Sequence, residues 1–358
     1  MGGKTLGRLE RLPVRSIVLI ALSAGVLVAV AYGSYKTLTL PAGERYSASA
    51  WRDFIVLGVA QGAVYALIAL GYTLVYGILR MINFAHGEVF MAGAFGSYFF
   101  ADAWSKSGFM NEQPWLSIVL LVLIAMIVSV AVAVLLERIA YRPLRGAPRL
   151  VPLITAIGAS LFLQNTFRGL FGSQTRGYPK PTMLEGTWTI LGIPVQKVQV
   201  LVLVVAAVAM VALTLFVART KTGKSMRASA EDQEIASLMG INVDRVIVTT
   251  FIIGGMLAGI AGVLFALTFG NISYFMGFAP GITAFTAAVL GGIGSIAGAA
   301  IGGLMIGVLQ SVGPALLLTG ANVPSPFQLK DVVTFAILIL VLIFRPGGIL
   351  GTGDAEKV

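Results

Sequence analysis

Long runs of apolar residues, separated by short polar segments, dominate the chain. Nine such runs stand out, and a helix needs about 20 mainly apolar residues to cross a bilayer. They are residues 16–35, 53–79, 84–101, 115–136, 150–171, 198–218, 246–269, 281–318 and 331–345. The pattern predicts an all-α polytopic membrane protein with short connections between its helices.

The eighth run, 281–318, is too long for one crossing and contains a glycine-rich stretch at 291–295. Such an interruption survives at membrane depth only when protein or water surrounds it. We therefore expect two crossings or a broken helix here. The chain then has about nine to ten transmembrane helices, including broken or re-entrant segments.

Composition excludes the main alternatives to a membrane protein. Hydrophobic residues make up 57% of the 358 residues and charged residues 11%, with a mean hydropathy of +0.92. A soluble fold of this composition would expose large apolar patches, and the low charge excludes a disordered chain. The chain has no cysteine, which excludes thiolate chemistry, and its single histidine leaves little from which to build a metal site.

Basic residues gather in alternate loops, and such clusters mark the cytoplasmic side of a membrane protein. With the N-terminus inside, ten crossings place both termini and 16 of the 25 basic residues in the cytoplasm. These are Lys4, Arg8, Arg11, Arg15, Arg80, Arg138, Arg142, Arg145, Arg149, Arg219, Lys221, Lys224, Arg227, Arg245, Arg345 and Lys357. The net charge of +10 therefore reflects membrane orientation rather than nucleic-acid binding.

The first apolar run has a second interpretation. A basic start, a short apolar run and the small residues at 29–31 are also typical of a cleaved signal peptide. Cleavage would leave residue 32 outside, so the topology of the remaining chain is the same in both cases. We favour a retained helix.

A short internal similarity is visible between two distant segments. Residues 84–87, Phe-Ala-His-Gly, recur as Phe-Ala-Pro-Gly at 278–281, each before a run rich in glycine and alanine. Transporters are often built from two repeats that bracket the pathway. An inverted repeat is one interpretation, and chance is the other.

Two segments resemble nucleotide-binding motifs, but each lacks a residue that its motif requires. The segment 222–225, Thr-Gly-Lys-Ser, lacks the earlier glycine of a phosphate-binding loop, because position 218 is alanine. The segment 292–297 lacks the acidic residue expected about 20 positions later. Gly294, Gly298 and Gly302 are spaced four apart, which favours close packing of helices instead.

The loop at 219–245 carries the clearest functional pattern. Residues 226–239 suit a short helix on the cytoplasmic face, with Ile235, Leu238 and Met239 on one apolar edge and Gly240 at its end. Such a helix docks in the groove of a protein partner or rests on lipid headgroups. Anionic lipid would repel the acidic residues at 231–234, so we favour a protein partner.

Several segments resemble one family. Residues 234–240 are similar to the E-A-A-x-x-x-G coupling motif of bacterial ABC importer permeases, although the Leu-Pro that often follows it is missing. The wider chain resembles the branched-chain amino acid permeases of the LivH type across about residues 53–358. The resembling segments are 71–78, 81–89, 137–145, 154–158, 230–232, 240–242, 284–295 and 330–333. Residues 1–50, a basic tail and an extra helix, have no counterpart in this resemblance.

The resemblance implies a multi-pass subunit of an ATP-driven importer in the bacterial cytoplasmic (inner) membrane, surrounded by lipid. Its substrates would be branched-chain and other hydrophobic amino acids. Residues 51–358 would form the permease domain, paired with a second homologous permease, two cytoplasmic ATPase subunits and an external substrate-binding protein. The chain would not be an enzyme and would have no catalytic residues. It would bind no cofactor, because the partner subunits use the ATP, and no metal or nucleic acid. The ATPases would contact the loop at Arg227, Glu231, Asp232, Glu234, Ala236 and Gly240.

Polar residues in or beside two apolar runs are candidates for the translocation pathway. They are Gln61, Tyr65, Asn83, His86 and Glu88. An ionisable residue inside a membrane is costly and suggests a function. The structural alternative, which we favour, is a water-exposed helix start, with Asn83 as the N-cap and Glu88 stabilised by the helix dipole.

Three rival functions stay open at this point. A related importer of urea or short amides has similar permeases. A self-sufficient carrier would not need the loop at 219–245. An intramembrane enzyme is disfavoured, because no catalytic set of residues can be assembled.

Overall fold

The computed structural model describes residues 14–41, 43–148, 150–190, 192–345 and 347–351. Lys4, Arg8, Arg11, Arg149 and Lys357 of the predicted cytoplasmic set lie outside these ranges. Within them, eight helices are long and apolar enough to cross a membrane. These are α2 (Val14–Leu38), α3 (Ala48–Leu79), α6 (Pro114–Leu136), α7 (Leu150–Phe171), α8 (Lys197–Arg219), α11 (Val243–Phe269), α13 (Ile296–Leu318) and α14 (Lys330–Phe344), the last taken together with the helical turn at 326–329 that precedes it.

Two further helices, α4 (His86–Ser107) and the shorter α12 (Phe278–Gly291), complete the bundle. All nine apolar runs are helical, so the predicted all-α polytopic fold is confirmed. The remaining elements are short. They are α5 (Phe109–Glu112), α9 (Lys221–Glu231), α10 (Gln233–Leu238), single turns at 137–144, 182–184, 319–321 and 326–329, and the strands β1 (Arg176–Gly177), β2 (Thr187–Ile190), β3 (Ile193–Gln196) and β4 (Asn271–Ile272).

The predicted break in the eighth run is confirmed. Helix α12 ends at Gly291 and α13 begins at Ile296. Gly292 and Gly294 have φ angles of 106° and 99°, which side chains of L-residues rarely allow. The packing role predicted for Gly294 is therefore wrong, because this glycine forms the turn and a Cβ atom on it would meet nothing within 4 Å.

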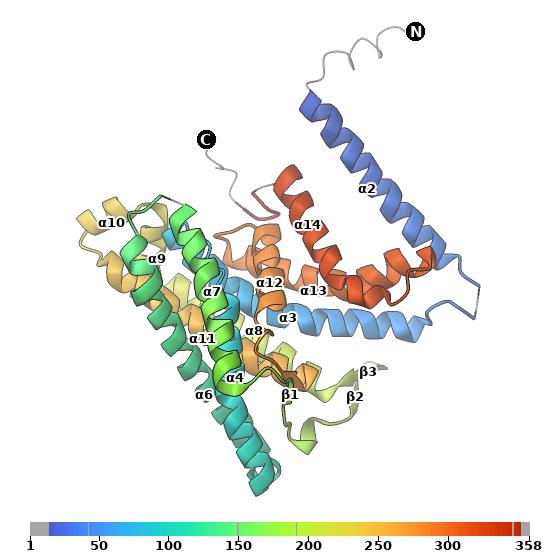
Figure 1. Cartoon of the computed structure of the whole chain (residues 1–358), viewed down its shortest axis with the longest axis horizontal. Coiled ribbons are helices and arrows are strands. Elements are labelled where there is room, and N and C mark those ends of the chain that lie inside the picture. Colours follow the sequence, from blue (N-terminus) through green and yellow to red (C-terminus); the bar gives the residue numbers. More distant parts are fainter. Residues whose placement is uncertain (1–13, 42, 149, 191, 346, 352–358) are drawn as a thin grey trace.

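Glycines bring the central helices into backbone contact. A Cβ atom on Gly298 or Gly302 of α13 would overlap the carbonyl oxygen of Gly291 or Ala287 in α12. On its other side α13 packs along α3, the innermost helix. In the most apolar 18-residue stretch of each span, 72% of the residues are buried in α3 and 67% in α11. The buried share is only 11% in α2 and 6% in the span that contains α14. Helices α2 and α14 therefore lie at the periphery (Figure 1).

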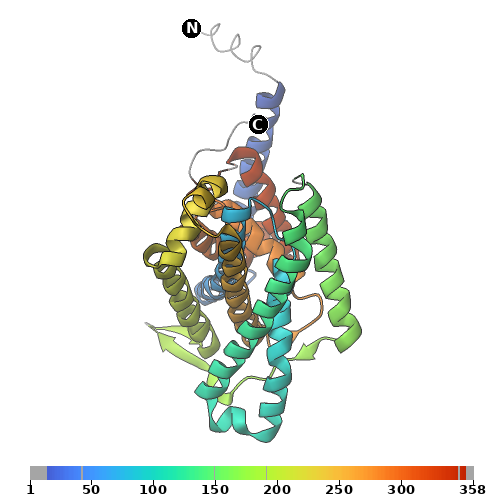
Figure 2. The same ribbon diagram turned by 90° about the vertical axis from the view of Figure 1, so that its left-hand side faces the viewer.

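The polar connections gather at two opposite ends of the bundle. At one end Arg145 pairs with Glu137 and Asp244, and α9 and α10 lie beside the end of α3. At the other end the turn from α4 to α6 lies near the strands, with Thr182 N–H donating to Asn111 at 3.0 Å. Figures 1 and 2 show the two ends apart from one another. The basic loops at 80–85, 137–148 and 219–245 thus lie at one end of the bundle.

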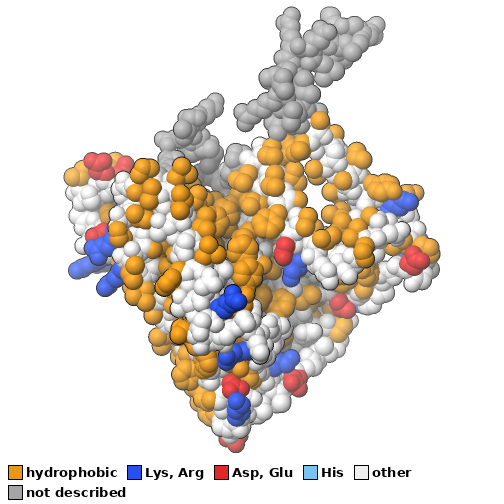
Figure 3. All heavy atoms as spheres, viewed as in Figure 1, with side chains coloured by type: hydrophobic (Ala, Val, Ile, Leu, Met, Phe, Trp, Pro, Cys, Tyr) orange, Lys and Arg blue, Asp and Glu red, His pale blue; other side chains and the backbone are white. Residues whose placement is uncertain are grey.

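Apolar side chains cover much of the surface. Figure 3 shows hydrophobic side chains over much of the visible face, with charged groups at the corner over α9 and α10, at the right-hand corner, and from the middle of the face down to the lower tip. Side chains such as Ile127 and Val208 are large, apolar and exposed midway along their helices. An apolar belt between two polar ends is what a bilayer requires.

The two similar tetrads lie against each other at the centre. Each stands at the start of a helix, α4 or α12, and a Cβ atom on Gly281 would lie 3.0 Å from Cα of Gly87. Helix α4 runs toward the end with the strands, where Ser97 bonds Tyr178 at 2.9 Å. Helix α12 runs the opposite way, to Gly292. The two segments therefore have the opposed directions of an inverted repeat.

Candidate functional site

The loop at 219–245 folds into two short helices rather than the single helix predicted over 226–239. Thr220 caps α9, and its Oγ1 accepts a hydrogen bond from Gly223 N–H at 3.0 Å. The chain then becomes extended at Asp232, whose carboxylate accepts from Ile235 N–H at 2.8 Å and begins α10. Aspartate is a favoured N-cap, and this local bond outweighs continuation of the helix. We call residues 220–240 the coupling segment.

Gly240 ends this segment in the conformation that the sequence predicts. Its φ is +83°, its N–H donates to Ser237 O, and Ile241 N–H donates to Ala236 O, both at 3.0 Å. This pair of bonds is the Schellman arrangement, with glycine at C′. A Cβ atom on Gly240 would meet no atom within 4 Å. Its requirement for glycine is therefore one of backbone angle, not of space.

The coupling segment presents both apolar and acidic groups to its surroundings. Leu238 and Met239 are 81% and 79% exposed, and Ile235 beside them is 60% exposed. Glu231, Asp232 and Glu234 are exposed, whereas Ala236 is buried. Arg227 is exposed overall, but its guanidinium donates to the carbonyl of Val217. An exposed apolar edge among charges suits a protein partner.

The segment is tied to the end of α3. The guanidinium of Arg80 donates to Ala230 O at 2.8 Å, and the amide of Gln233 donates to Ile78 O. Met226 and Ser229 of α9 are buried. These bonds join α9 and α10 directly to the end of α3. The sequence did not reveal these two contacts, because they join residues about 150 positions apart.

The candidate pathway residues are buried inside the bundle, and the predicted water-exposed helix start is wrong. Asn83, His86 and Glu88 are 3%, 2% and 1% exposed. Helix α4 begins with Ala85 as N-cap and has no side-chain cap. Asn83 instead accepts a hydrogen bond from the Tyr141 hydroxyl at 2.7 Å. The turn at 137–141, which follows α6, takes the place of water here.

Glu88 lies deep in the bundle beside α7. Its Oε1 accepts hydrogen bonds from Gln164 Nε2 at 2.7 Å and from Ser160 Oγ at 3.1 Å, and its Oε2 has no partner. Ser160 and Gln164 stand near the middle of α7, four residues apart on one face. That spacing of polar residues in an apolar helix is a signal from which both partners could have been found.

The other candidates do not join Glu88 in one site. His86 packs edge-on to Tyr72 with ring centroids 4.9 Å apart, and its Nε2 has no hydrogen-bond partner. Gly71 makes room for the imidazole, because a Cβ atom there would overlap it. Gln61 and Tyr65 are buried on α3, about three and two turns before Tyr72.

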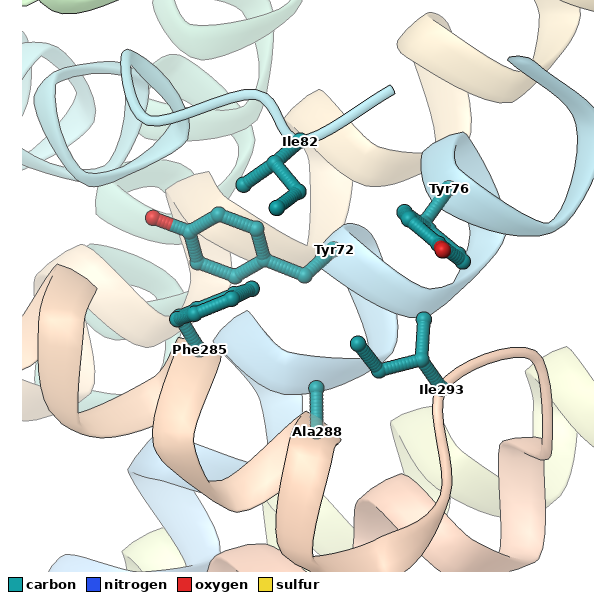
Figure 4. Close-up of a pocket in the computed structure, with 6 residues that line it drawn as sticks. All are labelled: Tyr72, Tyr76, Ile82, Phe285, Ala288 and Ile293. Carbon is teal, nitrogen blue, oxygen red and sulfur yellow. The ribbon is translucent and has the colours of Figure 1, made fainter. Parts of the chain in front are cut away.

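Two cavities adjoin Tyr72. The larger, about 230 Å³, has Glu88, Ser160 and Tyr72 in its wall. The smaller, about 10 Å³, lies toward the coupling segment and has Tyr76, Ile82 and Ile293 in its wall. Figure 4 shows the Tyr72 and Phe285 rings side by side next to this small void, with centroids 6.0 Å apart. Within the described residues, no group of three His, Asp or Glu side chains could hold a metal ion.

Comparison with known proteins gives a consistent result. The family model described as "Branched-chain amino acid transport system / permease component" matches residues 54–342. The chain is 46% identical to the high-affinity branched-chain amino acid permease LivH of Salmonella typhimurium, over 84% of this chain and 96% of that one. It is 45% identical to BraD of Pseudomonas aeruginosa, over 85% and 97%.

Among solved structures the chain has a distant likeness to PsaBC from Streptococcus pneumoniae. The identity is 15% over 84% of this chain and 91% of that one, with a TM-score of 0.40. The sequence relatives are transport subunits and not enzymes. Their similarity covers α3 to α14, including the coupling segment and the Glu88 cavity. The chain belongs to the permease components of branched-chain amino acid transport systems.

Proposed function

We propose that this chain is the membrane-spanning subunit of an ATP-driven importer of branched-chain and related hydrophobic amino acids, and that its coupling segment receives the force of ATP hydrolysis. The single observation that carries the mechanism is the attachment of the exposed α10 to α3 through Gln233 and Ile78. The family and the 46% identity to LivH support the substrate class.

The coupling segment would dock in a cytoplasmic ATPase subunit through Ile235, Leu238 and Met239, with Glu234 in a charge-assisted contact. Closure of the ATPases would move α10 and, through Arg80 and Gln233, the end of α3. Helix α3 carries Tyr72, which borders both central cavities. Such a linkage lets ATP bias a two-state opening of the pathway.

The complete importer would contain a second homologous permease, two ATPase subunits and an external substrate-binding protein, in the bacterial inner membrane. The chain itself would bind neither ATP nor another cofactor. The end of the bundle with β1 to β4 would face the binding protein, because it lies opposite the coupling segment (Figure 1).

The test uses Gly240→Val and Glu234→Lys in the assembled importer. Valine at a φ of +83° should misdirect the end of α10, and lysine should place a like charge against the ATPase. We expect both variants to insert at normal levels but to lose leucine uptake and co-purify poorly with the ATPases. The measurements are uptake in vesicles and the amount of ATPase retained.

Gly146→Val is the matched control. Gly146 is exposed at the same end, and a Cβ atom there meets nothing within 4 Å, but it has no left-handed backbone. This control should transport normally. Normal uptake with bound ATPases in both test variants would show that the segment is an ordinary surface structure.

A further inference from the structure

The last residues that the structure describes, 348–351, return to the break between α12 and α13. Ile349 N–H donates to Leu290 O at 2.8 Å, and Leu350 N–H donates to Gly291 O at 2.9 Å. The final carbonyls of a helix have no partner inside that helix, so these two bonds complete the end of α12. We call residues 348–351 the strap.

The strap also meets the turn after α12 in contacts between backbone atoms. A Cβ atom on Gly348 would overlap the backbone nitrogen of Gly292, and one on Gly292 would overlap that of Gly351. Gly348 also has a φ angle of +74°, which disfavours any side chain. A Cβ atom on the neighbouring Gly347 would meet nothing within 4 Å. The fit therefore depends on one glycine of this pair and not on the other.

The turn that the strap holds borders both α3 and the coupling segment. Ile293 stands in the wall of the small void with Tyr72 of α3, and Figure 4 shows both side chains. Gly294 stands in the wall of a different cavity of about 220 Å³, whose wall also includes Met226 and Ala230 of α9. A shift of this turn would therefore change the packing on α3 and the space next to α9 together.

The strap can leave the turn without unfolding a central helix. It follows α14, and in the most apolar stretch of that span only 6% of the residues are buried. The Leu350 side chain is 46% exposed. Segments with few buried contacts open locally at a lower free energy than global unfolding requires. The two hydrogen bonds of the strap can therefore break while the bundle stays folded.

We propose that the strap is a conformational lock on the inner end of the subunit, which is the end with the coupling segment. While both hydrogen bonds hold, the turn stays in place and Ile293 closes the void beside Tyr72, which at about 10 Å³ holds at most about one water. Release of the strap would let the turn move when the ATPases shift the coupling segment. The proposal rests on the importer function proposed above and adds a device that sets how readily the inner end opens.

The test follows the turn directly with a thiol probe. The chain has no cysteine, so Ile293→Cys places the chain's only thiol on the turn. Its rate of modification by a water-soluble maleimide is measured on this chain in the purified complete importer. In the Gly348→Ala background we expect labelling about fivefold faster, the factor that one lost hydrogen bond gives. Gly347→Ala is the matched control and should label like Ile293→Cys alone.

A second pair of variants removes one hydrogen bond and leaves the glycines intact. Proline has no N–H, so Leu350→Pro cannot donate to Gly291 O, whereas Leu350→Ala keeps the donor. Leu350→Pro should speed labelling about fivefold, and Leu350→Ala should not. This pair decides the matter if Gly348→Ala does not assemble.

The response to ATP distinguishes a lock from a fixed brace. In Ile293→Cys alone, ATP with the leucine-loaded binding protein should accelerate labelling, because the ATPases then open the inner end. In the assembled strap variant the turn is already released for part of the time, so the same addition should raise the rate by a smaller factor.

Three results would overturn the lock. The first is a labelling rate within about twofold of its matched control in assembled Gly348→Ala or, where that variant does not assemble, in Leu350→Pro. The second is failure of both variants to assemble, which would make the strap a part of the folded core. The third is an ATP response that the assembled strap variant does not reduce. Failure of the proposed function looks different, because the wild-type complex would then not import leucine, while labelling without ATP would still report on the strap.

Discussion

Glycine is required both in the central helices and in the coupling segment, but for different physical reasons. In α13, Gly302 faces the carbonyl of Ala287, and a side chain has no space there. In the coupling segment, Gly240 has open space around it and a left-handed φ of +83°. One position is limited by volume and the other by backbone angle.

The two regions therefore have different roles: the central helices hold the fold together, and the coupling segment is expected to contact a partner. Contacts between backbones at the centre hold the bundle together, because small residues let helices approach closely in lipid. The coupling segment is joined to the bundle by a few hydrogen bonds and leaves Leu238 and Met239 exposed. Damage to the centre should therefore remove the protein, and damage to the segment should remove only its activity.

The largest expected effect is at the centre. Gly302→Val should prevent α12 and α13 from packing, because the new side chain would overlap backbone atoms that cannot move aside. We expect little assembled protein, measured as the monodisperse fraction after solubilisation. Gly169→Val in α7 is the control, since a Cβ atom there meets nothing within 4 Å. Normal assembly of Gly302→Val would mean that backbone contact does not hold the centre.

An intermediate effect is expected where the segment after α6 meets the start of α11. Glu137 is fully buried and pairs with Arg145. Arg145→Ala leaves that carboxylate without its partner, which costs about 3–5 kcal/mol. The measurement is the thermal unfolding midpoint in detergent. The double variant with Glu137→Gln should recover part of the loss, and no recovery would exclude the buried charge as the cause.

The smallest effect on stability is expected at the joint between the two regions. Gln233→Ala removes one hydrogen bond to Ile78 O, worth about 1 kcal/mol. We expect an unfolding midpoint close to wild type, with leucine uptake reduced several-fold because α10 no longer pulls on α3. Ser237→Ala is the control, since Ser237 Oγ bonds only Glu234 O within the segment. Equal uptake in the two variants would show that the hydrogen bond between Gln233 and Ile78 does not connect α10 to transport.

Local patterns in the sequence predicted much of both regions correctly. The apolar runs predicted the helices, the glycines at 291–295 predicted the break between α12 and α13, and Gly240 predicted the helix end. The prediction of a single helix over 226–239 was wrong, although Asp232 is itself a good N-cap. Each of these features depends on residues within a few positions of one another.

The partners of buried polar groups could not be predicted in the same way. The local pattern suggests that Asn83 caps a helix, whereas its side chain in fact accepts a hydrogen bond from Tyr141 in the turn after α6. The local pattern suggests that Glu88 is an exposed acid in the first turn of a helix. In the structure it accepts hydrogen bonds from Ser160 and Gln164 of α7. These contacts join residues 58 to 76 positions apart, so no local pattern contains them.

The sequence by itself determined that the chain is a helical membrane protein, where its helices lie, and which loop carries an exposed apolar edge. Hydrophobicity and turn geometry are local properties, and they decide those features. Only the tertiary structure decided that Glu88 accepts hydrogen bonds from Ser160 and Gln164 of α7 and that α10 is tied to α3. Burial and hydrogen bonding depend on which helices become neighbours, and long-range packing settles that.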